Sequence, residues 1–169
     1  MNKSRPLELR RFKRSPQGLI QFAILLEQTT PTKRNEILKL VQLQDQGFYE
    51  DVLKKTVFFE ELVLLEDGII AEILFSTPPK VLAYALLDAP PDMRKKLENQ
   101  MGFRELRIVK DEEEKIGTNC PLWLISGARK RILIIARDLE KKQKFTLEIV
   151  KKPARPSLKE GGTSATSPS

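Results

Sequence analysis

At four points along the chain, a proline directly follows a serine, a threonine or another proline, and apolar residues at helical spacing come after it. The four pairs are Ser15-Pro16, Thr30-Pro31, Thr77-Pro78 and Pro90-Pro91. A serine or threonine side chain can satisfy the unpaired amide groups at a helix start, and proline is favoured at the first helical position. This pattern predicts a chain built from many short helices.

The spacing of the apolar residues gives the approximate extent of each helix. The expected helices cover residues 15–28, a segment from Pro31, a segment after Gly47, a short stretch around 58–65, residues 69–75, residues 81–87, a segment from Pro91, residues 103–116 and residues 121–142. Short joints between such helices are typical of stacked arrays of the armadillo kind and of helical bundles.

We therefore expect an all-α fold in two parts. An armadillo-like helical subdomain is predicted over 15–55, and a compact helical bundle that ends in a long helix over 56–150. The terminal segments 1–14 and 151–169 are expected to be a flexible basic N-terminus and a disordered tail, because they contain few apolar residues.

The same periodicity predicts which side chains are buried. In the helix over 103–116, the buried side is expected to carry Phe103, Leu106, Val109 and Ile116. In the last helix, the expected core residues are Trp123, Leu124, Ala128, Ile132, Ile135 and Leu139. Residues 145–150 alternate between apolar and polar and predict a short extended segment.

The net charge of +7 comes from the two ends of the chain. Residues 1–15 and 151–169 are both strongly basic, and residues 16–150 are close to neutral. Basic tails can contact an anionic membrane surface or nucleic acid, but their more common role is to solubilise flexible ends.

The residue types exclude most catalytic chemistry. The chain contains no histidine and a single cysteine, Cys120. Histidine-based acid–base catalysis, Ser-His-Asp and Cys-His nucleophiles and most transition-metal sites are therefore excluded. No glycine-rich phosphate-binding motif occurs either. We expect a protein that is not an enzyme, with no catalytic residues, no metal ligands, no cofactor and no small-molecule substrate. The apolar runs are too short for a membrane span, and the N-terminus shows no signal-peptide pattern.

The helix over 103–116 carries the most informative charges. Arg104, Asp111 and Lys115 are expected on one outward face, because seven residues make about two helical turns, and Glu112 is expected beside them. An exposed face with both signs of charge suits fast, reversible docking to another protein.

Two longer segments resemble a known family. They are TVFFEELVLLEDGIIAEIL (Thr56–Leu74) and VLAYALLDAPPDMRKKLENQMGFRELRIVKDEEEKIG (Val81–Gly117). The first resembles the Met-Phe-X-Phe hinge and the acidic, leucine-rich segment of the flagellar motor switch protein G (FliG) family. The second resembles the Ala-Leu-Lys-Gly-Ala, Leu-Arg-Glu-Lys and charged-helix pattern of that family's C-terminal domain at the same spacings.

The resemblance implies a rotor component that presents a charged ridge to the cytoplasmic loop of the flagellar stator. The ridge residues of the family match Arg104, Asp111 and Glu112, and the nearby Lys110 and Lys115 are candidates to replace two basic positions that fall on Leu87 and Cys120. The family's hinge falls on residues 56–59 and implies Phe58 and Phe59 as hinge residues; Phe59 matches the motif, whereas Thr56 and Val57 stand where the family has Met and Phe. The implied partners are the stator loop and rotor switch proteins, with self-stacking through the armadillo-like helices, at the cytoplasmic face of the inner membrane.

Two alternatives remain open at this point. The chain could be a helical scaffold or regulator outside the motor, since two basic ridge positions are lost. It could also bind nucleic acid through its basic tails and the cluster Arg129-Lys130-Arg131.

Overall fold

The computed structural model describes residues 8–142, 144, 145 and 147. The described residues form helices and no strand, which confirms the all-α prediction. The elements are α1 (Arg10–Lys13), α2 (Pro16–Glu27), α3 (Pro31–Gln44), α4 (Gln46–Lys55), the 3-10 helix η1 (Phe59–Leu64), α5 (Asp67–Phe75), α6 (Pro79–Leu86), α7 (Pro91–Asn99), α8 (Phe103–Ile116) and α9 (Leu122–Lys141).

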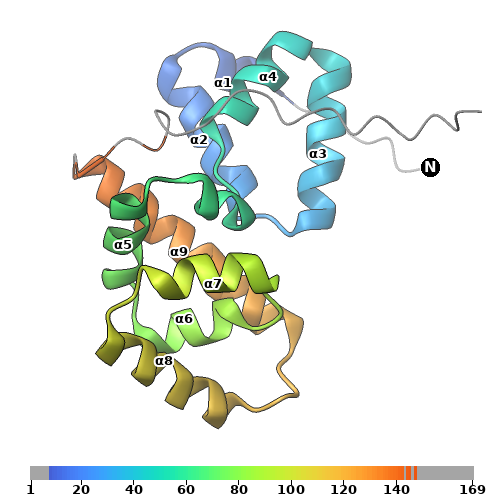
Figure 1. Cartoon of the computed structure of the whole chain (residues 1–169). Helices are drawn as coiled ribbons and strands as arrows, with labels where there is room; N and C mark the ends of the chain where they lie inside the picture. The colour runs from blue at the N-terminus through green and yellow to red at the C-terminus, as the bar shows by residue number, and fades with distance from the viewer. Residues whose placement is uncertain (1–7, 143, 146, 148–169) are drawn as a thin grey trace, which may run out of the picture.

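The helices group into two units with separate cores. The first unit, α1 to α4, lies at the top of Figure 1, and the second unit, η1 to α9, lies below it. The first core consists of Leu9, Phe22, Leu26, Val41, Phe48 and Val52. The second core is larger and begins at Val57, so the change from one core to the other falls in the linker between α4 and η1.

Helix α6 is the centre of the second unit. Four of its residues are buried, namely Leu82, Ala83, Ala85 and Leu86. Its most extensive contacts are with α8 and α9, and Figure 1 shows it among the helices of this unit. A helix this apolar must be covered by its neighbours, and α8 is one of them. In Figure 1, α8 lies at the end of the molecule opposite the first unit.

The segment before α2 differs from the flexible N-terminus expected over 1–14. Within its described residues, Leu9 is buried and Phe12 packs edge-on against Phe22, with ring centroids 5.0 Å apart. Leu9 and Phe12 are three residues apart, so one turn of helix brings both onto the same face. Two apolar residues in a basic segment are thus enough to dock α1 on α2.

The cap residues agree only in part with the predicted punctuation. Ser15 Oγ accepts a hydrogen bond from the Gly18 N–H at 3.1 Å, as expected. The helix expected after Gly47 begins one residue before it, at Gln46, because Asp45 caps α4 by accepting from the Phe48 N–H at 2.9 Å. Thr77 donates to the Ile73 carbonyl at 2.7 Å, so it closes α5 and does not cap α6.

Two predicted core residues are exposed. Phe103 is 86% exposed and Trp123 is 72% exposed. Trp123 precedes the buried Ile132 by nine residues, which is two and a half turns of helix, so the two side chains lie on opposite sides of α9. Phe103 lies about a third of a turn away from the buried side of α8 that Val109 defines. The predicted extended segment over 145–150 and the tail over 151–169 lie largely or wholly outside the described residues.

An ion pair fixes α8 against α7. Arg94 Nη2 donates to both carboxylate oxygens of Glu113, at 2.6 and 2.8 Å, and Arg94 Nε donates to Glu98 at 2.8 Å. The hydrogen bond to Glu113 raises the pKa of Arg94 further above its usual value. Both oxygens of Glu113 accept from one nitrogen, so the contact is a charge-assisted link that ties α8 to α7.

The close approach of α1 to α2 predicts an unusual response to substitution of Gly18. A Cβ atom at Gly18 would lie 2.5 Å from the carbonyl oxygen of Phe12, whereas one at Gly127, in α9, would meet nothing within 4 Å. We expect Gly18→Ala to lower the free energy of unfolding by about 1–3 kcal/mol through overpacking. Gly127→Ala should raise it by about 0.5–1 kcal/mol through helix propensity. Urea unfolding followed by circular dichroism measures both, and equal stabilisation by the two variants would contradict the close approach.

The contact between α7 and α8 predicts different effects for two adjacent glutamates. Glu113→Ala removes the partner of Arg94 and should lower the free energy of unfolding by about 1–2 kcal/mol. Glu114 is exposed, so Glu114→Ala should change it by less than about 0.5 kcal/mol. Urea unfolding followed by circular dichroism measures both variants. Equal changes in the free energy of unfolding would contradict a stabilising contact between Arg94 and Glu113.

Candidate protein-docking surface

Helix α8 is held on one side and free on the other. Val109 is buried, and Leu106 and Ile116 pack against the core of the second unit. The helix ends at Gly117, whose φ of 72° lies in the left-handed region that glycine adopts without strain. Helix α8 therefore presents a defined outer face at the lower end of the molecule in Figure 1.

The outer face of α8 carries four exposed charged residues, Arg104, Arg107, Asp111 and Lys115, which we call the charged face. Their spacing of three and four residues places them along one side of the helix. Within the described part of the chain, no ion pair within 4.0 Å involves Arg104, Arg107 or Asp111. These three charges are available to a partner.

The prediction for α8 omitted Arg107. It lies three residues after Arg104 and four before Asp111. Residues at this spacing share one side of a helix, so the sequence already placed Arg107 beside them. The described structure thus brings together Arg104, Asp111 and Lys115 as expected and adds a second arginine.

Glu112 lies on the flank of the charged face. It is half-buried, and its Oε1 accepts a hydrogen bond from Lys115 Nζ at 2.8 Å. This hydrogen bond lowers the pKa of Glu112 and raises the pKa of Lys115, so both groups are charged at neutral pH. The two charges largely neutralise each other, which leaves the arginine end of the face the more positive.

Lys110 does not join the charged face. It is exposed, but it lies seven residues after Phe103 and therefore on the same side of α8 as that ring, about a third of a turn from Arg104 and Asp111. Of the two lysines proposed as replacement charges, Lys115 lies on the charged face and Lys110 lies on a different side of α8.

Leu87 and Cys120, the two positions at which the resemblance implies basic residues, contribute no charge. Leu87 is half-buried at the end of α6, and its carbonyl accepts from Arg129 Nη2 at 2.8 Å. Cys120 is half-buried in the loop between α8 and α9. Arg129 also donates to the Ala85 carbonyl at 3.0 Å, and burial lowers its pKa. Arg129 therefore stabilises the end of α6 and is not part of an exposed basic cluster.

Phe58 and Phe59, the predicted hinge residues, are both buried. Phe59 belongs to the core of the second unit, where the guanidinium carbon of Arg129 lies 4.9 Å from its ring centroid. Phe58 belongs to neither core, and the guanidinium carbon of Arg34 lies 4.0 Å from its ring centroid. The linker is thus anchored on both sides by aromatic contacts.

The described residues contain neither a metal-binding cluster nor a single helix that could span a membrane. They hold no group of three or more Cys, Asp or Glu side chains that could bind a metal ion. In that same part of the chain, no single helix has the length and hydropathy to cross a membrane. The pair α5 and α6 passes that test of length and composition together, but it bends by 119° at the break between the two helices.

The family model and the similar proteins all point to the same family. Residues 39–147 match the family model of the FliG C-terminal domain. The flagellar motor switch protein FliG of Thermotoga maritima is 30% identical over 117 residues, which is 68% of this chain and 33% of that protein. FliG of Aquifex aeolicus is 27% identical over 124 residues, which is 73% of this chain and 38% of that protein. The chain thus spans 33% to 38% of the length of these relatives.

A solved structure supports the fold. A crystal structure of FliG from H. pylori superposes with a TM-score of 0.55 at 22% identity, and it covers 80% of this chain and 63% of that one. The resemblance drawn from the motifs is therefore confirmed, and the chain belongs to the FliG C-terminal domain family.

Proposed function

We propose that this chain is a non-enzymatic docking module of the flagellar rotor switch, which binds the cytoplasmic loop of the stator through the charged face of α8. The observation that carries the proposal is the outward placement of Arg104, Arg107 and Asp111, without ion-pair partners among the described residues, in a member of the FliG C-terminal domain family.

The charges of the face define the partner. Arg104 and Arg107 lie in the first half of α8 and call for acidic groups, and Asp111 calls for a basic group about one turn further along. Interactions of this kind set the rate and orientation of encounter more than the final affinity. A motor component that engages and releases its partner repeatedly has need of such contacts.

The lost basic positions narrow the proposed role. With Leu87 and Cys120 in place of two charges, the face offers fewer attractions to an acidic loop than a complete ridge would. We therefore propose docking, with Lys115 as a partial replacement, and no torque generation of the ordinary kind.

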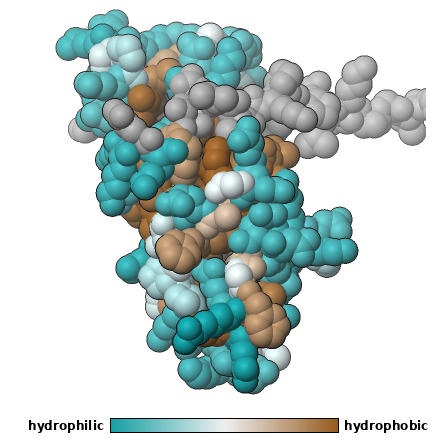
Figure 2. Space-filling view, turned by 60° about the vertical axis from the view of Figure 1, so that its left-hand side comes forward, coloured by the Kyte–Doolittle hydropathy of each residue, from teal (hydrophilic) through white to brown (hydrophobic). Residues whose placement is uncertain are grey.

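Exposed apolar residues of the first unit support contacts with rotor proteins or with another copy of the chain. They are Ile20 and Leu25 on α2 and Leu40 and Leu43 on α3, and Figure 2 shows apolar side chains among the hydrophilic ones on one face of the molecule. Exposed apolar side chains on the helices of this unit suit a stacking contact between armadillo-like units. Such assembly would place the module at the cytoplasmic face of the inner membrane, in the flagellar basal body.

Charge reversal on α8 tests the proposal. Affinity co-purification of the tagged chain from its own cells should recover stator or switch-complex proteins, identified by mass spectrometry. The double variant Arg104→Asp with Asp111→Arg should reduce recovery of the stator protein at least tenfold, because both attractions become repulsions. The matched control, Lys33→Glu with Glu36→Lys, exchanges two exposed charges on α3 and should leave that recovery unchanged.

The outcomes separate the alternatives. Equal recovery of the stator protein with the α8 variant would show that the charged face is not the docking surface. Recovery of nucleic acid or of proteins unrelated to the motor would remove the assignment to the flagellar rotor and leave the fold unaffected.

A further inference from the structure

The junction between the two units joins α2 and α9 through polar contacts, beside the buried Phe58 of the linker. The helix pairs with the most extensive contacts all lie inside one unit or the other. Where α2 of the first unit meets α9 of the second, a hollow of about 90 Å³ remains between them. Its wall includes Ile24 from α2 and Leu133 and Ile134 from α9, so apolar side chains are present there without filling the space.

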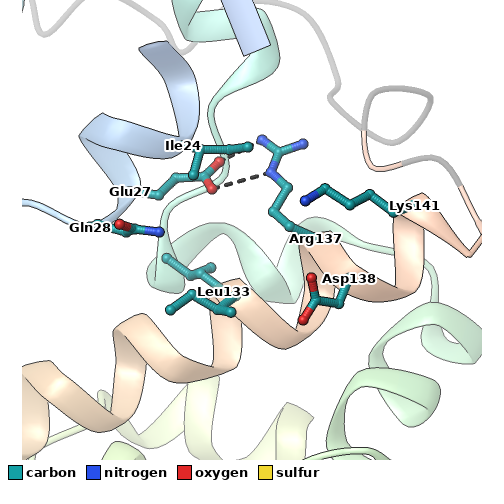
Figure 3. Close-up of a pocket in the computed structure, with 8 residues that line it drawn as sticks. Ile24, Glu27, Gln28, Leu133, Arg137, Asp138 and Lys141 are labelled. Atoms are coloured by element: carbon teal, nitrogen blue, oxygen red, sulfur yellow. Dashed lines mark hydrogen bonds and ion pairs between the residues drawn. The ribbon is translucent and has the colours of Figure 1, made fainter. Parts of the chain in front are cut away.

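A buried ion pair crosses this junction. Glu27 at the end of α2 is 3% exposed, and Arg137 on α9 is 8% exposed. Arg137 Nη2 donates to Glu27 Oε1 at 2.5 Å, and Arg137 Nε donates to Glu27 Oε2 at 3.2 Å. Figure 3 shows the guanidinium of Arg137 reaching from α9 toward the carboxylate of Glu27, while Asp138 points away from it.

The same two side chains hold the linker between the units. Glu27 Oε1 also accepts a hydrogen bond from the Val57 N–H at 2.8 Å. Arg137 Nη2 also donates to the Lys55 carbonyl, and Arg137 Nη1 donates to Glu140 at 2.7 Å. Two side chains thus bind α2, α9 and both sides of the buried Thr56.

In the closed junction, the polar atoms of Glu27 and Arg137 are hydrogen-bonded to protein groups. In an open junction, water would take the place of these protein groups. Separation of the pair within the closed junction would leave a buried charge without a partner, which is strongly unfavourable. If the units move apart, both groups become hydrated and no such penalty arises. The pair therefore disfavours arrangements in which the junction is only partly open.

We propose that Glu27 and Arg137 form a clamp that holds the two units in one orientation, and that loss of the clamp widens the range of orientations that the units adopt about the linker between α4 and η1. The clamp sets the direction in which α8 presents its charged face relative to the first unit. This inference goes beyond the docking role and does not depend on the identity of the partner.

Distance measurements between spin labels test the clamp. Cys120→Ser removes the native thiol, and Lys39→Cys on α3 with Lys95→Cys on α7 place one label on an exposed position of each unit. Pulsed electron paramagnetic resonance on the full chain should give one narrow distance distribution. Arg137→Gln should at least double its width or add a second population. A width unchanged from the parent would overturn the proposal.

Two further variants separate the clamp from general loss of stability. Lys141→Gln changes an exposed residue one turn along α9, in the wall of the same hollow, and should leave the distribution unchanged. Glu27→Gln removes the charge and keeps an oxygen that accepts from the Val57 N–H, so it should broaden the distribution while circular dichroism retains the parent's helix content. If Arg137→Gln does not fold, the result for Glu27→Gln decides, and a parental width in that variant overturns the clamp.

Discussion

A carboxylate at the end of α2 and a guanidinium on α9 meet where the two units join, 110 residues apart in the chain. A hollow lies beside them and the two units have separate cores, so these two side chains, together with the buried Phe58 of the linker, hold the units in their relative position. The first unit, residues 8–55, is too short to be strongly stable by its own core alone. The Glu27–Arg137 contact therefore affects the first unit's stability as well as the direction in which the second unit faces.

The second unit positions α8 so that its charged face is exposed. Helix α6 packs against α8 and α9, and Arg94 ties α8 to α7 through Glu113. These contacts use only the inner side of α8, which leaves Arg104, Arg107 and Asp111 exposed. The fold and the proposed docking specificity thus depend on opposite sides of one helix, and the charges can change between relatives without loss of the fold.

The sequence alone predicts the helices and much of the site, and it fails where distant residues decide. Proline positions and apolar spacing locate most helix starts, and the seven-residue separation of Arg104 and Asp111 places them correctly on one face. Trp123 was assigned to the core because α9 has apolar residues on both sides, so periodicity alone does not select the buried one. The Glu27–Arg137 pair was missed because its partners are far apart in the chain. Its only local signal is a glutamate that directly follows the apolar Leu25 and Leu26.

Residual dipolar couplings of the backbone amides test most directly whether the unmodified chain is one rigid body in solution. The clamp predicts that a single alignment tensor fits the couplings of α2 to α4 and of α5 to α9 together. Two tensors of clearly different magnitude or orientation, one for each unit, would mean that the units reorient freely and that the Glu27–Arg137 contact does not hold them.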